Sequence, residues 1–98
     1  MVGSIIDGKQ HAISLRKRIK LATDNLISKY GITPGLAVVL VGNDPASEIY
    51  VRNKGIQTKE AGMESLEFRL PEDTSEEKLL KNVKALNKNQ SVNGILVQ

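Results

Sequence analysis

Cysteine and tryptophan are absent from the 98-residue sequence, and histidine occurs once. Without cysteine the chain can form neither disulfide bonds nor thiolate metal sites, and His11 has no plausible co-ligands near it in the sequence. No segment approaches the ~18 to 20 apolar residues of a membrane span, and the start MVGSIIDGKQ lacks the basic residues and long apolar run of a signal peptide. We therefore expect a cytoplasmic protein with no metal site and no membrane association.

Positive charge is unevenly distributed along the chain, whose formal net charge is +3. Residues 1–30 carry six Lys/Arg and two Asp, whereas the rest of the chain carries eight basic and nine acidic side chains. Much of the excess lies in RKRIK, residues 16–20, next to Leu15 and around Ile19 at helical spacing. This segment is either a solvated helix face or a phosphate-binding stripe. No aromatic stacking residues accompany it, which argues against nucleic-acid binding.

Helices and strands are expected to alternate along the chain. The expected helices run from Gly8 to about Lys29, from Pro45 to Gly62, and from Thr74 to about Leu86. The expected strands are LAVVLV (36–41), ESLEFRL (64–70) and the ILV that follows Gly94. The continuous apolar run of the first strand is typical of a central strand covered on both faces, and the alternation of the second is typical of an edge strand. The fold class is thus α/β, a parallel sheet with helices packed on it.

Three helix starts carry local signals. Asp7 and Gly8 can open the first helix. Asp44 is placed to cap the second helix, with Pro45 at the first helical position, where its missing N–H leaves no hydrogen bond unmade. Thr74 and Glu77 have the spacing of a capping box for the third helix.

The second helix is expected to present three faces. At about 100° per residue, an apolar face should pack on the sheet and a charged face should meet water, with Glu48 and Arg52 spaced for an ion pair. The apolar face consists of Ala46, Ile49 and Ile56, and the charged face of Glu48, Arg52 and Lys59. Ser47, Tyr50 and Lys54 form the third face.

The third face lies where a ligand site is expected. A helix that follows a parallel strand begins at the carboxyl edge of the sheet, where open α/β sheets bind ligands. Gln98, at the carboxyl end of another strand, opens onto the same edge. Spacing alone leaves plainer explanations open: the Lys54 stem packs on the Tyr50 ring, Ser47 serves the helix start, and Gln98 simply ends a strand.

Four short motifs along the chain together resemble the pattern of a known enzyme family. VGNDPASEIYVRNK, the EAG that follows, NGILVQ at the end of the chain and the opening IIDGK occur here in one register. In these motifs the whole chain resembles the N-terminal catalytic domain of the bifunctional methylenetetrahydrofolate dehydrogenase/methenyltetrahydrofolate cyclohydrolase family.

The resemblance implies roles for four residues. In that family the helix Tyr and Lys and the strand-ending Gln line the folate pocket, and they match Tyr50, Lys54 and Gln98. The Ser that matches Ser47 lies near the site. Lys54 and Gln98 are thus the catalytic candidates, and Tyr50 and Ser47 bind substrate. The implied reactions are oxidation of 5,10-methylenetetrahydrofolate by NADP and hydrolysis of the methenyl product to 10-formyltetrahydrofolate. Relatives that only dehydrogenate can lack the Lys, so Lys54 favours cyclohydrolase competence.

The chain also departs from the family pattern. The family continues beyond this Gln with LPLP, a KDVDG-type segment and a dinucleotide-binding domain, and no G-x-G-x-x-G occurs here. Residues 1–98 are therefore expected to be the incomplete N-terminal folate-binding domain of a two-domain enzyme, a fragment that is inactive alone and binds no NADP itself. For the complete enzyme the resemblance implies tetrahydrofolate substrates, NADP, a cytoplasmic homodimer, and a place in one-carbon metabolism and purine biosynthesis.

A function from another class remains open on the residues alone. The chain could be a non-catalytic α/β interaction or dimerisation module whose contact surface is the basic first helix. That hypothesis predicts that Lys54 behaves as an ordinary surface lysine and that folate does not protect the chain.

Overall fold

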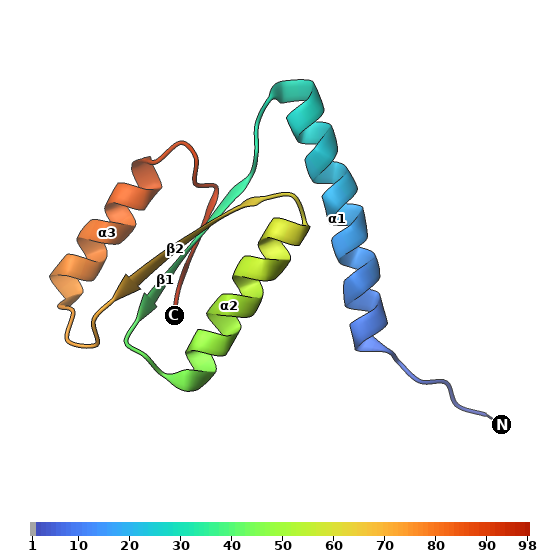
Figure 1. Ribbon diagram of the computed structural model, residues 1–98, viewed down its shortest axis with the longest axis horizontal. Helices are drawn as coiled ribbons and strands as arrows, with labels where there is room; N and C mark the ends of the chain where they lie inside the picture. The colour runs from blue at the N-terminus through green and yellow to red at the C-terminus, as the bar shows by residue number, and fades with distance from the viewer. Residues whose placement is uncertain (1) are drawn as a thin grey trace.

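The computed structural model describes residues 2–98, in which three helices and three strands alternate (Figure 1). The elements are α1 (Gly8–Tyr30), β1 (Gly35–Val41), α2 (Pro45–Glu60), β2 (Glu64–Leu70), α3 (Glu76–Lys88) and β3 (Gly94–Val97). Every element predicted from the sequence is present, with boundaries shifted by no more than about two residues.

The three strands form one parallel sheet in the order β2-β1-β3. Val39, at the middle of β1, pairs with Phe68 on one side and with Val97 on the other. Ala37, Val39 and Leu40 have no exposed surface, because helices cover both faces of the central strand. The predictions of a central β1 and an edge position for β2 are both confirmed.

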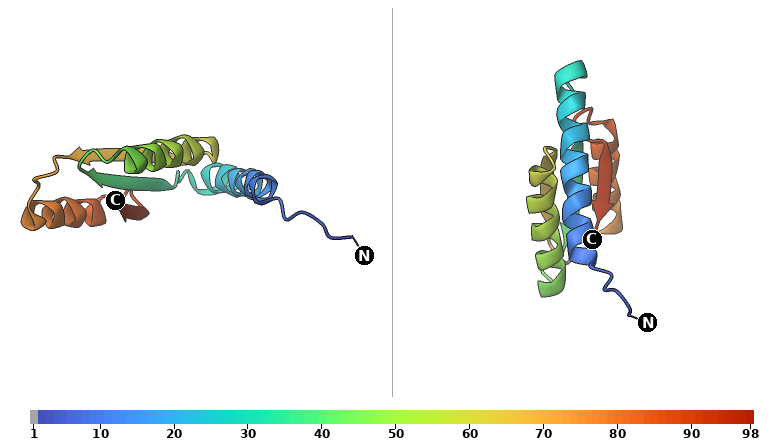
Figure 2. Two further views of the ribbon diagram at one scale, coloured as in Figure 1. Left: turned by 90° about the horizontal axis from the view of Figure 1, so that it is seen from below. Right: turned by 90° about the vertical axis from the view of Figure 1, so that its right-hand side faces the viewer.

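Two helices cover opposite faces of the sheet (Figure 2). Alternate residues of β1 therefore enter two separate cores. Val38 and Leu40 pack with Val51 of α2, and Ala37 and Val39 pack with Leu86 of α3. The α2 side carries the residues of the third face.

The first helix lies to one side of this three-layer arrangement, next to the end of α2 (Figures 1 and 2). Thr23, 2% exposed, is the point of α1 that is most deeply buried, and it faces Gly62 in the turn after α2. Gly62 has φ 81°, and a Cβ there would lie 3.3 Å from the Thr23 methyl group and 3.2 Å from Lys20. Glycine is therefore needed both for the turn and for the close approach of α1.

The molecule is flat and extended for its length. Its principal extents are 56 × 39 × 18 Å and its radius of gyration is 16.6 Å. A compact domain of this length has a radius of gyration of about 13 Å. The position of α1 beside the sheet and the extended residues 2–7 that precede it account for the difference (Figure 1).

One predicted helix cap is wrong by one residue. Asp7 and Asp44 cap α1 and α2 as expected, each accepting a backbone hydrogen bond of 3.0 Å. In α3, however, the side chain of Ser75 accepts from the Lys78 N–H at 3.2 Å. Thr74 is unavailable as a cap because its hydroxyl and its N–H both donate to the Pro71 carbonyl in the preceding turn.

Candidate functional site

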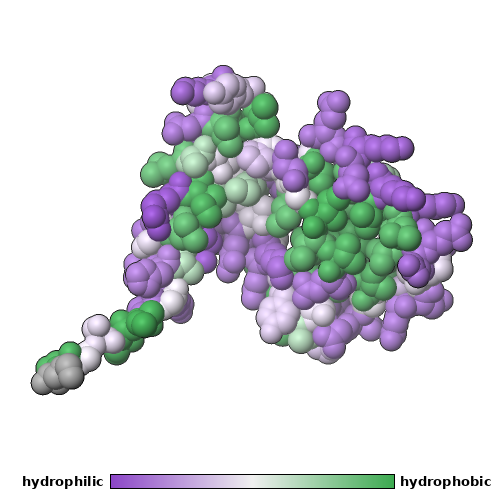
Figure 3. Space-filling view, turned by 180° about the vertical axis from the view of Figure 1, so that it is seen from behind, coloured by the Kyte–Doolittle hydropathy of each residue, from purple (hydrophilic) through white to green (hydrophobic). Residues whose placement is uncertain are grey.

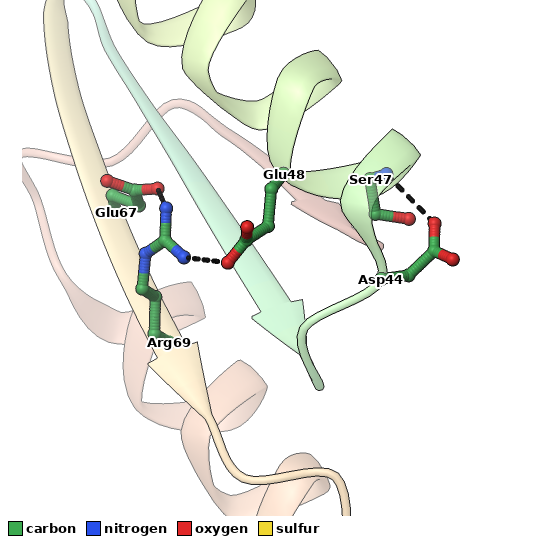
Figure 4. A network of polar contacts seen from close by, with 5 residues as sticks. All are labelled: Asp44, Ser47, Glu48, Glu67 and Arg69. Atoms are coloured by element: carbon green, nitrogen blue, oxygen red, sulfur yellow. Dashed lines mark hydrogen bonds and ion pairs between the residues drawn. The ribbon is translucent and has the colours of Figure 1, made fainter.

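The second helix starts directly beyond the carboxyl end of β1. The Asp44 carboxylate accepts a hydrogen bond of 3.0 Å from the Ser47 N–H, and Pro45 begins the helix (Figure 4). These contacts fix the first turn of α2 at the carboxyl edge of the sheet. Ser47 therefore contributes its backbone to the helix cap, and its side chain is half-buried.

The face of α2 that packs on the sheet differs from the prediction. Ile49 and Ile56 are 54% and 50% exposed, and Ala46 is exposed as well. The buried residues are Val51, 2% exposed, and Thr58, 9% exposed. The assignment of Ala46, Ile49 and Ile56 to the sheet is therefore wrong.

Small side chains explain this orientation of the helix. Ser47, Val51, Gly55 and Thr58 follow one another at helical spacing along the inward face. A Cβ at Gly55 would lie 3.5 Å from the Ser65 hydroxyl of β2, so the helix backbone approaches the sheet closely there. Close contact along a stripe of small residues outweighs burial of the two larger isoleucines. That stripe is the sequence signal that would have given the correct face.

Lys54 and Gln98 meet across the gap between α2 and β3. The Lys54 ammonium donates a hydrogen bond of 3.2 Å to the Gln98 side-chain oxygen, and both residues are half-buried. The same ammonium lies 5.6 Å from the centre of the Tyr50 ring, within the range of a cation–π contact. Tyr50 remains 57% exposed, so its ring is accessible to a ligand. The structure thus brings together three of the four predicted site residues.

The backbone of Gln98 is part of the sheet. Its N–H donates to the Val39 carbonyl at 2.8 Å, and its own carbonyl accepts from the Val41 N–H at 2.9 Å. The Gln98 amide is therefore anchored to the central strand at the carboxyl edge, and it can direct the Lys54 ammonium.

A second polar cluster lies on the opposite flank of α2, and sequence reasoning missed it. Arg69 of β2 donates to Glu48 of α2 at 2.9 Å and to Glu67 of its own strand at 3.0 Å (Figure 4). The hydrogen bond that Arg69 donates to Glu48 and the negative charge of Glu67 raise the pKa of Arg69. Glu48 therefore pairs with Arg69 and not with Arg52, so the predicted pair within α2 is wrong. The reason is the unexpected orientation of the helix, which turns Glu48 toward β2.

The candidate site lies at the surface, with Tyr50 exposed and Lys54 and Gln98 half-buried. A hollow of about 680 Å³ lies elsewhere, where β2 leads into α3, and is lined by residues that include Leu70, Asp73, Ser75 and Lys78. None of these side chains belongs to the Lys54 group. Within residues 2–98, no cluster of His, Asp and Glu has the grouping of a metal site. The helices described there also lack the combination of length and hydrophobicity that spanning a membrane requires.

Comparison with known proteins assigns the chain to a family. The family model described as tetrahydrofolate dehydrogenase/cyclohydrolase, catalytic domain, matches residues 6–98. The chain belongs to this family. The resemblance inferred from the sequence is therefore confirmed.

Individual members of the tetrahydrofolate dehydrogenase/cyclohydrolase family are similar over the whole chain. A bifunctional protein FolD of Parvibaculum lavamentivorans is 57% identical over 98 residues, which cover all of this chain and 33% of that protein. A bifunctional protein FolD 2 of Paracoccus denitrificans is 54% identical over 96 residues, or 98% of this chain and 32% of that protein. The chain thus spans about a third of the length of these curated relatives, and it matches their N-terminal part.

Solved structures of the family have the same fold over these residues. The bifunctional FolD methylenetetrahydrofolate dehydrogenase/cyclohydrolase of Campylobacter jejuni is 40% identical with a TM-score of 0.93, covering 97% of this chain and 33% of that one. A Trypanosoma brucei methylenetetrahydrofolate dehydrogenase-cyclohydrolase, solved with NADP and an inhibitor, is 29% identical with a TM-score of 0.94, covering 98% and 33%. The α/β fold and its place as the N-terminal portion of a longer family member are confirmed.

Proposed function

We propose that these 98 residues supply the folate site of a bifunctional enzyme of one-carbon metabolism. That enzyme oxidises 5,10-methylenetetrahydrofolate to the methenyl compound and hydrolyses this to 10-formyltetrahydrofolate. The proposal rests chiefly on one observation: in a chain of this family, the Lys54 ammonium lies 3.2 Å from the Gln98 amide oxygen and 5.6 Å from the Tyr50 ring centre.

The geometry supports a division of roles. Tyr50 presents an accessible ring on which a flat heterocycle can stack, which is worth about 0.5 to 1.5 kcal/mol beyond burial of area. Gln98 holds the side chain of Lys54 through its anchored amide. Ser47, one turn earlier on α2 than Val51, lines the same inward flank of the helix and contacts substrate.

Lys54 moves a proton during hydrolysis. A water molecule adds its oxygen to the methenyl carbon and gives up a proton, and the bond from that carbon to one folate nitrogen then breaks. The Lys54 side-chain nitrogen accepts one proton as the water adds and returns it to the departing nitrogen. The hydroxyl group left on the carbon loses its own proton to solvent as that bond breaks, and its oxygen becomes the formyl oxygen. General acid–base catalysis of this kind supplies about 10² to 10⁴ in rate.

The oxidation needs a hydride acceptor, which the proposal takes to be NADP. The residues present do not fit a dinucleotide: Gly42 follows β1 with φ 86°, but it stands without the further glycines of a pyrophosphate turn, and Glu72 lies against it. An acidic side chain there would repel a phosphate. We therefore place NADP binding outside these 98 residues and derive no step through it. A homodimeric, cytoplasmic enzyme that supplies purine biosynthesis completes the proposal.

A hybrid enzyme tests the function. Residues 1–98 replace the matching third of the Parvibaculum lavamentivorans relative, and methenyl hydrolysis and NADPH formation are followed by absorbance. We expect both activities in the hybrid and neither in the 98-residue chain alone. A folded hybrid that lacks both activities would support the non-catalytic interaction module instead.

A further inference from the structure

Two side-chain hydrogen bonds join α2 to the sheet within residues 2–98, one on each flank of the helix. On the β3 flank Lys54 donates to Gln98 at 3.2 Å, and on the β2 flank Glu48 accepts from Arg69 at 2.9 Å. Val51, which faces the sheet, lies three residues after Glu48 and three before Lys54. At about 100° per residue, Glu48 and Lys54 therefore project from the helix about 60° to either side of Val51, when the helix is viewed along its axis.

Apolar packing does little to stop α2 from rolling about its axis. The inward face consists of small side chains, and the larger Ile49 and Ile56 are half exposed on the far side. Val51 is the apolar side chain of α2 that is buried against the strands, where it packs with Val38 and Leu40. A single contact at the middle of the inward face resists rolling of the helix only weakly. The hydrogen bonds on the two flanks therefore determine the rotation of α2 about its axis.

Arg69 is well suited to hold one flank. One terminal nitrogen contacts Glu48 and the other contacts Glu67, so the guanidinium plane is oriented by its own strand before it reaches the helix (Figure 4). All three side chains are about half exposed, and exposed ion pairs of this kind add little to the free energy of folding. The contacts of Arg69 therefore matter for the orientation of α2 on the sheet more than for the stability of the fold.

We infer that Arg69 is a positioning residue for the folate site: by holding Glu48, it fixes the roll of α2 and so the place of Lys54 and Tyr50 relative to Gln98. This inference rests on the proposed function. A roll of about 10° moves an atom ~6 Å from the helix axis by about 1 Å. A misplacement of this size can cost up to ~10²-fold in rate.

The test uses the hybrid enzyme. Arg69→Met removes the contact from the strand side, and Glu48→Gln weakens it from the helix side, which provides a second variant if the first fails to fold. We expect each to lower kcat for methenyl hydrolysis at least fivefold, with the melting temperature nearly unchanged. Arg69→Lys keeps the charge but not the two-pronged geometry, so it should restore only part of the rate. Arg52→Met, an exposed cation of α2 outside the cluster, is the matched control and should keep the parental kcat.

A double-mutant cycle separates positioning from general destabilisation. If Arg69 acts through Lys54, Arg69→Met should have no further effect on the residual hydrolysis of the Lys54→Met enzyme. Equal fold-losses in both backgrounds, or a parental rate in Arg69→Met and Glu48→Gln, would overturn the inference while leaving the proposed function intact. A folded parent hybrid with no hydrolysis would contradict the proposed function and this inference with it.

Discussion

The aliphatic part of the Lys54 side chain and its ammonium group can be given separate tests, because methionine replaces the first and lacks the second. Lys54→Met keeps most of the volume and helix propensity of the side chain, so packing against Tyr50 and the free energy of unfolding should change little. The ammonium that contacts Gln98 is lost. In the hybrid enzyme we expect methenyl hydrolysis to fall at least about a hundredfold, or ~2.7 kcal/mol in activation free energy, while NADPH formation falls less.

The control for Lys54→Met is Lys59→Met, which removes an exposed ammonium from the same helix. It should leave both activities at the parental level. If Lys54→Met also hydrolysed the methenyl compound at the parental rate, Lys54 would be a packing residue whose stem rests on the Tyr50 ring.

Among the elements, the contact between α1 and the rest of the chain depends on Gly62. Gly62→Ala forces a side chain into a backbone with φ 81° and places a Cβ 3.3 Å from Thr23. We expect a loss of about 2 kcal/mol or more in the free energy of unfolding, measured with urea.

Gly31 provides a matched control for that loss. It has φ 65°, but no other atom lies within 4 Å of the position that a Cβ would take there. Gly31→Ala should therefore lower the free energy of unfolding by about 1 to 2 kcal/mol, because alanine disfavours a positive φ, but it adds no close contact such as the one with Thr23. Equal losses for the two variants would show that the close approach of α1 adds nothing.

The order and type of the elements were predictable because strong local signals mark them. Asp7, Asp44 and Pro45 start helices, and the unbroken apolar run of β1 indicates a strand buried on both faces. The α3 cap was missed because Thr74 and Ser75 are both capable caps, and the turn at Pro71 decides between them.

The candidate site was predictable only in part. Tyr50 and Lys54 are one turn apart on a helix, so their contact follows from local geometry, and Gln98 was placed at the same edge by the parallel topology. The pair of Glu48 with Arg69 depends on how far α2 is rotated on the sheet. Which side of α2 faces the sheet follows from the close approach at Gly55. The prediction instead ranked burial of Ile49 and Ile56 above the stripe of small residues that marks this side.

For the whole molecule, exposed apolar surface predicts self-association of the 98-residue chain. Figure 3 shows a broad hydrophobic area on the side of the sheet that carries α3. Leu21, Ile49 and Ile56 are at least half exposed on the helices. We expect sedimentation velocity to show species larger than a monomer as the concentration rises, and Ile56→Lys to reduce them. A monomer with sharp two-state unfolding and high stability would contradict this.

The whole chain is also expected to bind no dinucleotide. Calorimetry of residues 1–98 with millimolar NADP should give no saturable heat, whereas the hybrid enzyme should bind it. Stoichiometric binding to the 98-residue chain would mean that Gly42 and its neighbours form a phosphate site after all.

The strand order β2-β1-β3 has a consequence for synthesis on the ribosome. The central strand is made first, and neither of its partners exists until β2, Glu64–Leu70, has been translated. At about 5 to 20 residues per second, the most apolar segment of the chain therefore has no partner strand for roughly 1.5 to 6 seconds after its own synthesis. During that interval LAVVLV, which is apolar, rich in β-branched residues and free of charge and proline, has the composition of a segment that pairs with copies of itself, so the strand order lengthens the time during which the nascent chain can aggregate.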